Sequence, residues 1–370
     1  MMACQSEKTF WKRRCHFMML FFMAGIILLV FYSSGLEAPR HLNRSLYYPA
    51  PQVRNVTDSR EAGGDGGGLT QRDQGGEAGH SEISTPQEST SQYFVAYPHH
   101  YNYILDEPNK CRQESPFLVL IIPVTADNVE AREIIRNTWG RDTTVQGQVV
   151  HHYFLLGRSM ERNGIERLKE QVASESQKHH DILQSDFVDS YNNLTIKTMV
   201  MFEWLSTHCP KTSYAMKVDS DVFLNVPKLV DLLLKAPQHL YLMGIMAGGT
   251  SVVRDRNSKW FLPISVFPEP TYPPYALGLG YVFSLDLPKK IVDASAHVKA
   301  IYIEDVYLGL CMRHLGIAPR DPPRGGLFRV FAPPSISKCY WNSIIVTLLP
   351  NSKKILDAWK TYEVDAKSGC

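Results

Sequence analysis

The sequence predicts an α/β fold in which a mostly parallel, doubly wound sheet follows an N-terminal transmembrane helix and a flexible stem. Three features of the chain predict it: an uncharged apolar run near the N-terminus, a polar and glycine-rich stretch after it, and an alternation of strand-like and helix-like segments beyond Cys111. Strands that alternate with helices favour a parallel sheet, because each helix returns the chain to the edge where the next strand starts.

The composition is that of an ordinary globular protein. Of 370 residues, 44% are hydrophobic and 21% are charged, with 39 Lys+Arg against 37 Asp+Glu. These values exclude a mostly disordered or collagen-like chain. The formal net charge of +2 argues against nucleic acid as a partner, since nucleic-acid-binding proteins usually carry a clear basic excess.

The N-terminal segment predicts a membrane anchor. Residues 1–16 carry four basic side chains, and the uncharged run within residues 17–34 is slightly shorter than the ~20 residues that span an average bilayer. The basic cluster predicts a cytosolic tail and places the rest of the chain in the lumen. A cleaved secretory signal is the alternative, although no A-x-A-like cleavage site follows the run.

Residues 35–103 are predicted to form a flexible stem, and residues 104–370 the globular domain. The segment Gly63–Gly68 reads GGDGGG within a polar stretch that cannot bury enough apolar surface to fold. A disordered tail without a spacer role fits the same composition. Three N-x-S/T sequons lie beyond the predicted anchor, where they are candidates for glycosylation: Asn43, Asn55 and Asn193.

From Phe117 onward the elements can be predicted one by one. The continuous apolar run Phe117–Val124 predicts a strand that is buried on both faces. Asn128–Trp139 predicts a helix, with acidic residues in its first turn. The elements that follow are strand 149–156, helix 160–177, strand 182–187, helix 194–208, strand 214–218 and helix 227–234.

Asp219-Ser220-Asp221 follows the strand predicted over 214–218. Ligands of open parallel sheets bind at the carboxyl ends of the strands. Two carboxylates one residue apart can point at one divalent cation such as Mg²⁺ or Mn²⁺, although a solvated turn is the alternative for so short a motif. The apolar Val222–Leu224 excludes an EF-hand and predicts a turn held between buried elements. The sequence also contains no P-loop, H-E-x-x-H or G-x-S-x-G motif.

A second acidic site is Glu304-Asp305, at the start of a predicted helix. A helix N-terminus stabilises carboxylates, so helix capping is one interpretation of the pair. A fixed base that deprotonates a hydroxyl group is the other.

Five ordered segments resemble those of β-1,3-glycosyltransferases, and most closely those of the β-1,3-galactosyltransferase branch. They are AREIIRNTWG (131–140), DFVDSYNNLTIKT (186–198), KVDSDVFLN (217–225), YPPYALGLGYVFS (272–284) and EDVYLG (304–309). The resemblance covers about residues 111–359. It implies a catalytic domain of the Rossmann-like GT-A fold, a UDP-sugar donor, Mn²⁺ (or Mg²⁺) as cofactor, and inversion at the anomeric carbon.

The resemblance also implies roles for the acidic residues. Asp221 would bind the metal directly, and Asp219 would contact it through water or contact the donor ribose. Asp305 would be the base that activates the 3-hydroxyl of the acceptor. Glu304 would be its neighbour or, alternatively, the base itself.

Other motif residues are expected near the substrates. On the nucleotide side the resemblance points to Arg132, Arg136, Trp139, Asp186, Lys197, Asp219 and Ser220. On the acceptor or donor-sugar side it points to Trp260, Tyr275, Gly278 and Gly280. For the aromatic residues, packing in the core is the alternative.

Two positions depart from the family pattern. Ala276 stands where relatives usually have Cys. Leu348 stands where many relatives have a metal-binding His, nine positions after Cys339. A leucine cannot bind a cation, so weaker metal affinity, a substitute ligand or loss of activity is expected.

Five cysteines lie beyond the predicted anchor, so at least one stays free or pairs with another chain: Cys111, Cys209, Cys311, Cys339 and Cys370. The resemblance implies Cys111–Cys209 and Cys311–Cys339 as disulfides.

The middle residue of the metal motif, Ser220, favours UDP-galactose as donor by association with galactosyl-transferring relatives. The expected acceptor is a terminal GlcNAc or GalNAc on a glycoprotein or glycolipid, and the expected location is the Golgi membrane, in a type II orientation. The alternatives are a β-1,3-N-acetylglucosaminyltransferase that uses UDP-GlcNAc, and an inactive, sugar-binding or chaperone-like member. The sequence leaves the oligomeric state open, a homo-oligomer included.

Overall fold

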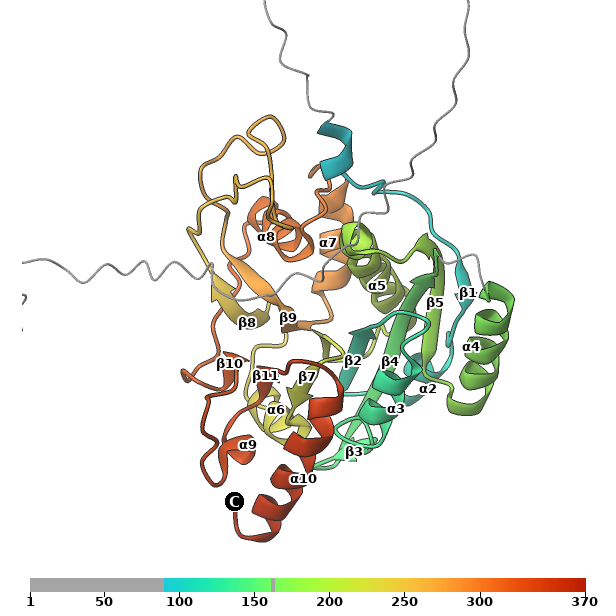
Figure 1. Cartoon of the computed structure of the whole chain (residues 1–370), viewed down its shortest axis with the longest axis vertical. Helices are drawn as coiled ribbons and strands as arrows, with labels where there is room; N and C mark the ends of the chain where they lie inside the picture. Colours follow the sequence, from blue (N-terminus) through green and yellow to red (C-terminus); the bar gives the residue numbers. More distant parts are fainter. Residues whose placement is uncertain (1–89, 161–163) are drawn as a thin grey trace, which may run out of the picture. The chain divides into compact units, whose positions relative to one another are not determined.

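The computed structural model describes residues 90–160 and 164–370 (Figure 1). The predicted tail, the predicted anchor and the sequons at Asn43 and Asn55 lie outside these residues. Within the part of the chain that is described, no helix is both long and apolar enough to cross a membrane. The chain already contacts the domain within the predicted stem, since the Val95 amide donates to the carbonyl oxygen of Ala300 at 3.0 Å.

An eight-stranded sheet forms the centre of the domain. Its order is β1-β5-β4-β2-β6-β9-β8, and β3 pairs with β4. The strands are β1 (Tyr103–Leu105), β2 (Leu118–Pro123), β3 (Thr144–Val145), β4 (Gln148–Arg158), β5 (Ile182–Val188), β6 (Tyr214–Val218), β8 (Leu242–Ala247) and β9 (Tyr275–Ser284).

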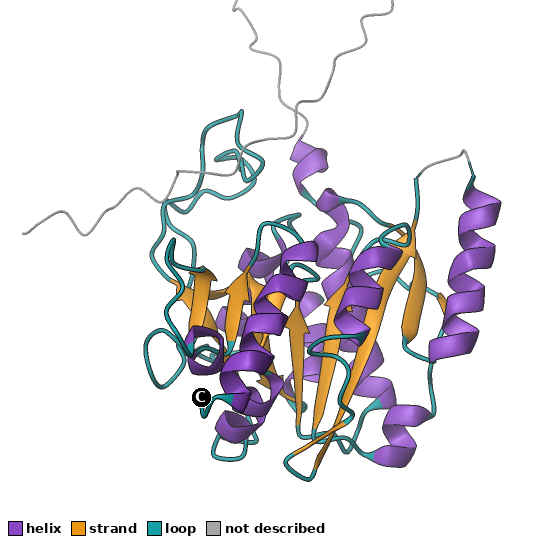
Figure 2. Cartoon of the chain, turned by 60° about the horizontal axis from the view of Figure 1, so that its bottom comes forward, coloured by secondary structure: helices purple, strands orange, loops and turns teal. Residues whose placement is uncertain are grey.

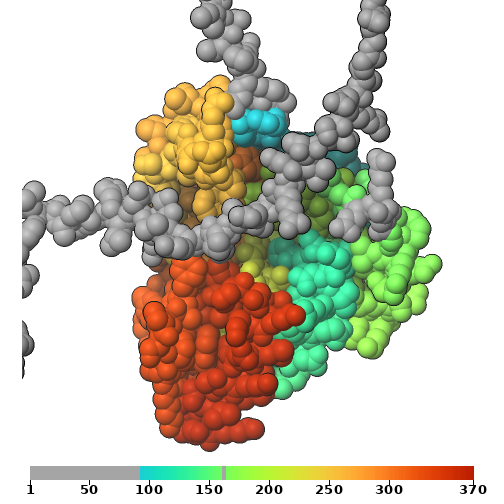
Figure 3. All heavy atoms as spheres, viewed as in Figure 1, coloured from blue at the N-terminus to red at the C-terminus, as the bar shows by residue number. Residues whose placement is uncertain are grey.

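The prediction of a mostly parallel sheet holds for the centre and is wrong for the edges. The four strands β5-β4-β2-β6 are parallel, whereas β1, β9 and β8 each run antiparallel to their neighbours. β8 and β9 run antiparallel because the segment that joins them is a loop and not a helical crossover, which would return the chain to the edge where the previous strand started. Residues 248–274 join them without a helix and project as a lobe from the domain, in gold in Figure 3.

Helices cover both faces of the sheet (Figure 2). Alternate residues of β2 belong to different hydrophobic cores, Leu118 and Leu120 to one, and Val119 and Ile121 to the other, which explains why the strand is a continuous apolar run. The helices are α2 (Lys110–Glu114), α3 (Val129–Arg136), α4 (Ile165–His179), α5 (Leu194–His208), α6 (Val226–Leu233), α7 (Leu287–Ser295), α8 (Glu304–His314), α9 (Tyr340–Ser343) and α10 (Lys353–Lys367), with 3₁₀ turns η1 (Thr90–Tyr93) and η2 (Tyr191–Asn193).

Two predicted elements have the observed bounds, and two are shorter than predicted. α5 and β6 match their predictions residue for residue. α3 starts where the side chain of Asn128 accepts the Ala131 amide at 3.1 Å, and it ends three residues before the predicted end. α4 begins at Ile165, because Gly164 precedes it with a φ of 75° that is incompatible with a helix.

The turn predicted between buried elements is confirmed at Asp219–Asp221, and the apolar Val222–Leu224 that follows it is a strand, β7. It belongs to a separate three-stranded sheet of order β10-β11-β7, with β10 at Phe328–Phe331 and β11 at Val346–Leu348. Its partner β11 lies more than one hundred residues downstream, so the local pattern held no signal for the pairing.

One predicted disulfide is confirmed and the other is wrong. Cys111 is bonded to Cys209, as predicted, but Cys339 is bonded to Cys370. Cys311 is a free, buried thiol on α8. It belongs to one hydrophobic core, whereas the residues that follow Cys339 belong to the core on the opposite face of the sheet, so the predicted partners cannot meet.

A buried ion cluster joins α3, α4 and the turn after β2. Arg132 is fully buried and donates to both carboxylate oxygens of Glu175, at 2.8 and 2.7 Å. It also donates to the carbonyl oxygens of Thr125 and Ala126, at 2.9 and 3.0 Å. The guanidinium group therefore fixes the turn that follows the central strand.

We predict that Arg132→Met destabilises the protein by about 2–4 kcal/mol, because two carbonyl groups lose their buried donor and Glu175 keeps only Arg136 as an ion-pair partner. Urea denaturation measures the change. Arg141→Met is the matched control: that arginine makes exposed ion pairs with Asp142 and Glu363, so its loss changes the free energy of unfolding by at most about 1 kcal/mol. If the two substitutions lowered the free energy of unfolding equally, the stabilising role of the buried Arg132 would be contradicted.

Candidate active site

The Asp219-Ser220-Asp221 motif lies at the junction of the two sheets. It connects β6, in the large sheet, to β7, in the small one. The Asp219 amide donates to the carbonyl oxygen of Leu279 in β9 at 3.1 Å, and the Leu349 amide donates to the carbonyl oxygen of Asp221 at 2.9 Å. Both sides of the turn are therefore held by backbone hydrogen bonds.

Lys217 connects this motif to the second acidic pair. Its buried ammonium group donates to Asp219 Oδ1 at 2.6 Å and also to the carbonyl oxygen of Gly278. The Gly278 amide in turn donates to Asp305 Oδ2 at 3.2 Å. The two acidic motifs, more than 80 residues apart in the sequence, thus belong to one hydrogen-bonded network.

Gly278 allows β9 to pass close to the acidic pair. A Cβ atom at this position would lie 3.1 Å from Glu304 Oε2 and 3.6 Å from Asp305 Oδ2. A side chain there would therefore meet both carboxylates. Gly280, two residues on, lies against Met216 rather than against the acidic pair.

Glu304 and Asp305 occupy the first turn of α8 and have different partners. Glu304 Oε1 accepts the Tyr281 hydroxyl at 2.7 Å and the Thr198 hydroxyl at 3.0 Å. Asp305 accepts backbone amides, from Gly278 and from Val306. Burial, and then the charge of Glu304, raise the pKa of Asp305 to about 7, against the opposing effect of the two amides.

Asp221 is a partly buried carboxylate next to a second acidic group. Burial, and then the charge of Asp219, raise its pKa to about 6. Two oxygen ligands that repel each other in this way suit a Mg²⁺ or Mn²⁺ ion whose other ligands are phosphates and water. Within the described part of the chain, no group of three or more His, Cys, Asp or Glu side chains is placed to hold a metal ion.

Leu348 lies beside this motif. It pairs with Val222, the residue after Asp221, across β11 and β7. The position that the family pattern assigns to a histidine is thus next to the candidate metal site, and here it carries an aliphatic side chain.

The residues predicted on the nucleotide side are engaged by protein groups. Arg132 belongs to the buried ion cluster, and Arg136 binds Asp181 at 2.8 Å. Trp139 is buried and donates its indole N–H to the carbonyl oxygen of Val222 at 3.1 Å, so it supports the backbone that leaves the metal motif.

Asp186 and Lys197 lie in different places. Asp186 accepts the backbone and side-chain N–H groups of Asn102, both at 3.0 Å, next to the edge strand β1. Lys197 is buried and donates to Asp189 at 2.7 Å and to the carbonyl oxygen of Val124 at 2.9 Å. Burial lowers the pKa of Lys197.

The sequon at Asn193 is tied into the fold next to α5. The Asn193 amide group donates to the carbonyl oxygen of Val188 at 2.8 Å. The hydroxyl of Thr195 is buried and donates to the carbonyl oxygen of Ile301 at 2.8 Å.

Tyrosine side chains lie near the acidic pair. Burial, and then the charge of Asp305, raise the pKa of both Tyr275 and Tyr191 to about 12. Trp260 is 40% exposed on the lobe between β8 and β9. Tyr191 lies within the motif at 186–198 but has no local signal in the sequence that marks it as a site residue.

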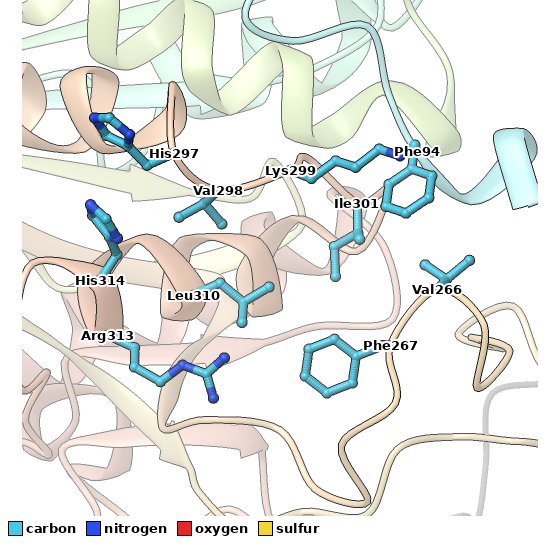
Figure 4. A pocket seen from close by; sticks show the side chains of 10 residues that line it. All are labelled: Phe94, Val266, Phe267, His297, Val298, Lys299, Ile301, Leu310, Arg313 and His314. Atoms are coloured by element: carbon cyan, nitrogen blue, oxygen red, sulfur yellow. The ribbon is translucent and has the colours of Figure 1, made fainter.

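Two hollows lie away from the acidic motifs. One of about 400 Å³ is bordered by the C-terminal half of α8, with apolar side chains such as Val266 and Leu310 beside Arg313 and His314 (Figure 4). The other, of about 250 Å³, lies near the start of β4. Neither is lined by the carboxylates of the two acidic motifs.

Two family models of galactosyltransferases match the chain. A family model described as Galactosyltransferase matches residues 130–323, and one described as Beta-1,3-galactosyltransferase 2 N-terminus matches residues 36–119. Among solved structures, the WbbM bifunctional glycosyltransferase aligns with 68% of this chain and 51% of its own at 9% identity. The TM-score of this alignment is 0.37.

Curated relatives share extensive sequence with the chain. Mouse beta-1,3-galactosyltransferase 2 is 38% identical over 275 residues, which are 74% of this chain and 64% of the mouse protein, and the human protein is 37% identical with the same coverage. Mouse beta-1,3-galactosyltransferase 1 is 42% identical over 60% of this chain and 68% of its own length. The chain thus spans a little less than two thirds of the first two relatives. Since the Galactosyltransferase model covers more than half of the 370 residues, the chain belongs to the galactosyltransferase family.

Proposed function

We propose that this protein is an inverting β-1,3-galactosyltransferase with a GT-A catalytic domain. It would transfer galactose from UDP-galactose to the 3-hydroxyl of a terminal GlcNAc or GalNAc on a glycoprotein or glycolipid. The observation that carries the proposal is the network from Asp219 through Lys217 and Gly278 to Asp305. The identity of 37–42% with beta-1,3-galactosyltransferases supports galactose as the transferred sugar.

The donor side of this site is the metal motif. Asp221 and Asp219 would hold Mn²⁺ or Mg²⁺ together with the phosphates of the donor. A bound cation neutralises the negative charge that develops on a departing diphosphate. The raised pKa of Asp221 supports this assignment, because a nearby cation would relieve the repulsion between the two carboxylates.

The acceptor side is organised by Asp305. Its carboxylate would take the proton of the acceptor 3-hydroxyl as that oxygen forms a bond to the anomeric carbon and the bond to UDP breaks. A base contributes most when its pKa lies near the working pH, and the charge of Glu304 helps to keep Asp305 in that range. One displacement with one base inverts the anomeric configuration.

We place this reaction on the luminal side of the Golgi membrane. The support is the basic cluster before the apolar run within residues 17–34, which predicts a type II orientation.

The direct test is transfer from UDP-galactose, with UDP-GlcNAc in parallel, to GlcNAc and GalNAc glycosides. We predict that Asp221→Asn lowers galactose transfer by at least about 10²-fold, because the cation loses its direct ligand. The melting temperature should stay close to that of the wild type. Full turnover by this variant would show that the metal assignment is wrong, and preferential transfer from UDP-GlcNAc would replace the proposed donor.

The pH dependence tests the proposed base. At saturating Mn²⁺, kcat/KM should fall about tenfold per pH unit below a midpoint near 7, because protonated Asp305 cannot accept the hydroxyl proton. Glu304→Gln keeps an oxygen for the Tyr281 and Thr198 hydroxyls and removes the neighbouring negative charge. The midpoint should therefore move to lower pH.

Glu166→Gln is the control for this experiment, since Glu166 is a highly exposed carboxylate on α4. It should leave the midpoint unchanged. A pH profile that is flat between pH 5 and 8, or that shifts equally in both variants, would contradict the role of Asp305.

Substitutions at Leu348 test the affinity of the proposed metal site for Mn²⁺. We predict that Leu348→His lowers the Mn²⁺ concentration required for half-maximal transfer, because the imidazole adds a ligand beside Asp221. Leu348→Phe fills a similar volume without a ligand atom and should not lower it. A wild-type protein that shows no metal-linked UDP binding by calorimetry, and gains none in Leu348→His, would support the inactive alternative.

A further inference from the structure

Three exposed side chains contact one another on the surface of the domain. They are Tyr191, Lys259 and Trp260, which we call the aromatic platform. The ammonium nitrogen of Lys259 lies 4.7 Å from the ring centroid of Trp260 and 5.2 Å from that of Tyr191. A cation is attracted to the face of an aromatic ring, so one lysine holds two rings that come from distant parts of the chain.

The platform is anchored to the segment that leads into α8. The hydroxyl of Tyr302 lies 2.9 Å from the carbonyl oxygens of both Lys259 and Phe261. Its single proton is shared between them and fixes the turn that they flank. From the other side, the Thr195 hydroxyl at the start of α5 donates to the carbonyl oxygen of Ile301. Both halves of the platform are thereby positioned by the residues that come directly before Glu304-Asp305.

The two rings remain partly open to solvent. Tyr191 is 44% exposed and Trp260 is 40% exposed. Burial, and then the charge of Asp305, raise the pKa of Tyr191, so this ring lies within reach of the electrostatic field of the proposed base. Partly exposed aromatic rings offer an apolar face, and a pyranose sugar presents such a face through its axial C–H groups while its hydroxyls point outward.

We propose that Tyr191 and Trp260 form the surface on which the acceptor hexosamine stacks, with its 3-hydroxyl turned toward Asp305. The ligand class is a β-linked GlcNAc or GalNAc. The proposal rests on the proposed function, and it adds Tyr191 as a residue that positions the acceptor. Neither ring would touch the donor.

Steady-state kinetics of the full-length protein separates acceptor binding from donor binding. In Tyr191→Ala and in Trp260→Ala, the KM for methyl β-N-acetylglucosaminide or its GalNAc equivalent should rise roughly tenfold, while the KM for UDP-galactose and the melting temperature stay near their wild-type values. Tyr191→Phe, which keeps the ring face, should recover most of the loss. Ile264→Ala is the matched control, since Ile264 is 68% exposed on the same lobe.

The results distinguish this inference from the proposed function. If the alanine variants leave the acceptor KM unchanged, or raise both KM values equally, the platform is overturned and the galactosyltransferase assignment stands. If the wild-type protein transfers no galactose, that assignment fails. The aromatic platform is then tested by titrating the protein with the same glycosides and measuring its tryptophan fluorescence. Quenching that disappears in Trp260→Ala and persists in Ile264→Ala supports it, whereas equal quenching in both variants, or none in the wild type, overturns it.

Discussion

The architecture of the candidate site depends on the neutralisation of one buried ammonium group. Lys217 is 5% exposed, and a charge at that depth costs several kcal/mol unless it is paired. Burial alone lowers its pKa, but the charges of Asp219 and Glu304 outweigh burial, and the pKa is raised. Strands β6 and β9 and helix α8 must therefore pack so that their acidic and carbonyl oxygens surround this nitrogen. That arrangement also brings the metal motif and the proposed base to one place.

A second constraint comes from the junction of the two sheets. The backbone of Asp219 is hydrogen-bonded to β9 in the large sheet. The backbone of Asp221 is hydrogen-bonded to Leu349, the residue after β11 in the small sheet. The separation of the two carboxylates is thus set by how the sheets are joined. Since β11 pairs directly with β7, one residue of β11 lies beside the motif, and this residue is Leu348. A substitution at that position would change the surroundings of the candidate metal motif without altering either aspartate.

The parts of the fold that could be predicted are those with local signals. The bounds of α5 and β6 follow from apolar pattern and flanking polar residues, and the two acidic motifs could be recognised by their spacing and order. The small sheet, the Cys339–Cys370 bond and the antiparallel edge strands depend on pairings between distant segments, which leave no periodic signal in either partner. Lys217 and Tyr191 were missed for the same reason. Their environment is created by the fold, because a lysine in a strand and a tyrosine in a polar turn are both ordinary in sequence.

Glu304 and Asp305 have different hydrogen-bond partners, which explains how two adjacent carboxylates can have different roles. Glu304 Oε1 accepts two hydroxyl hydrogens, from Tyr281 and Thr198, so both lone pairs of that oxygen are engaged inside the protein. Each oxygen of Asp305 accepts one backbone amide and keeps a lone pair for a substrate. Environments that differ in this way separate the roles of neighbouring titratable groups. The charge of Glu304 adds to the effect of burial in raising the pKa of Asp305. The Tyr281 and Thr198 hydroxyls hold Glu304 in place. Asp305 is therefore the better candidate for the base.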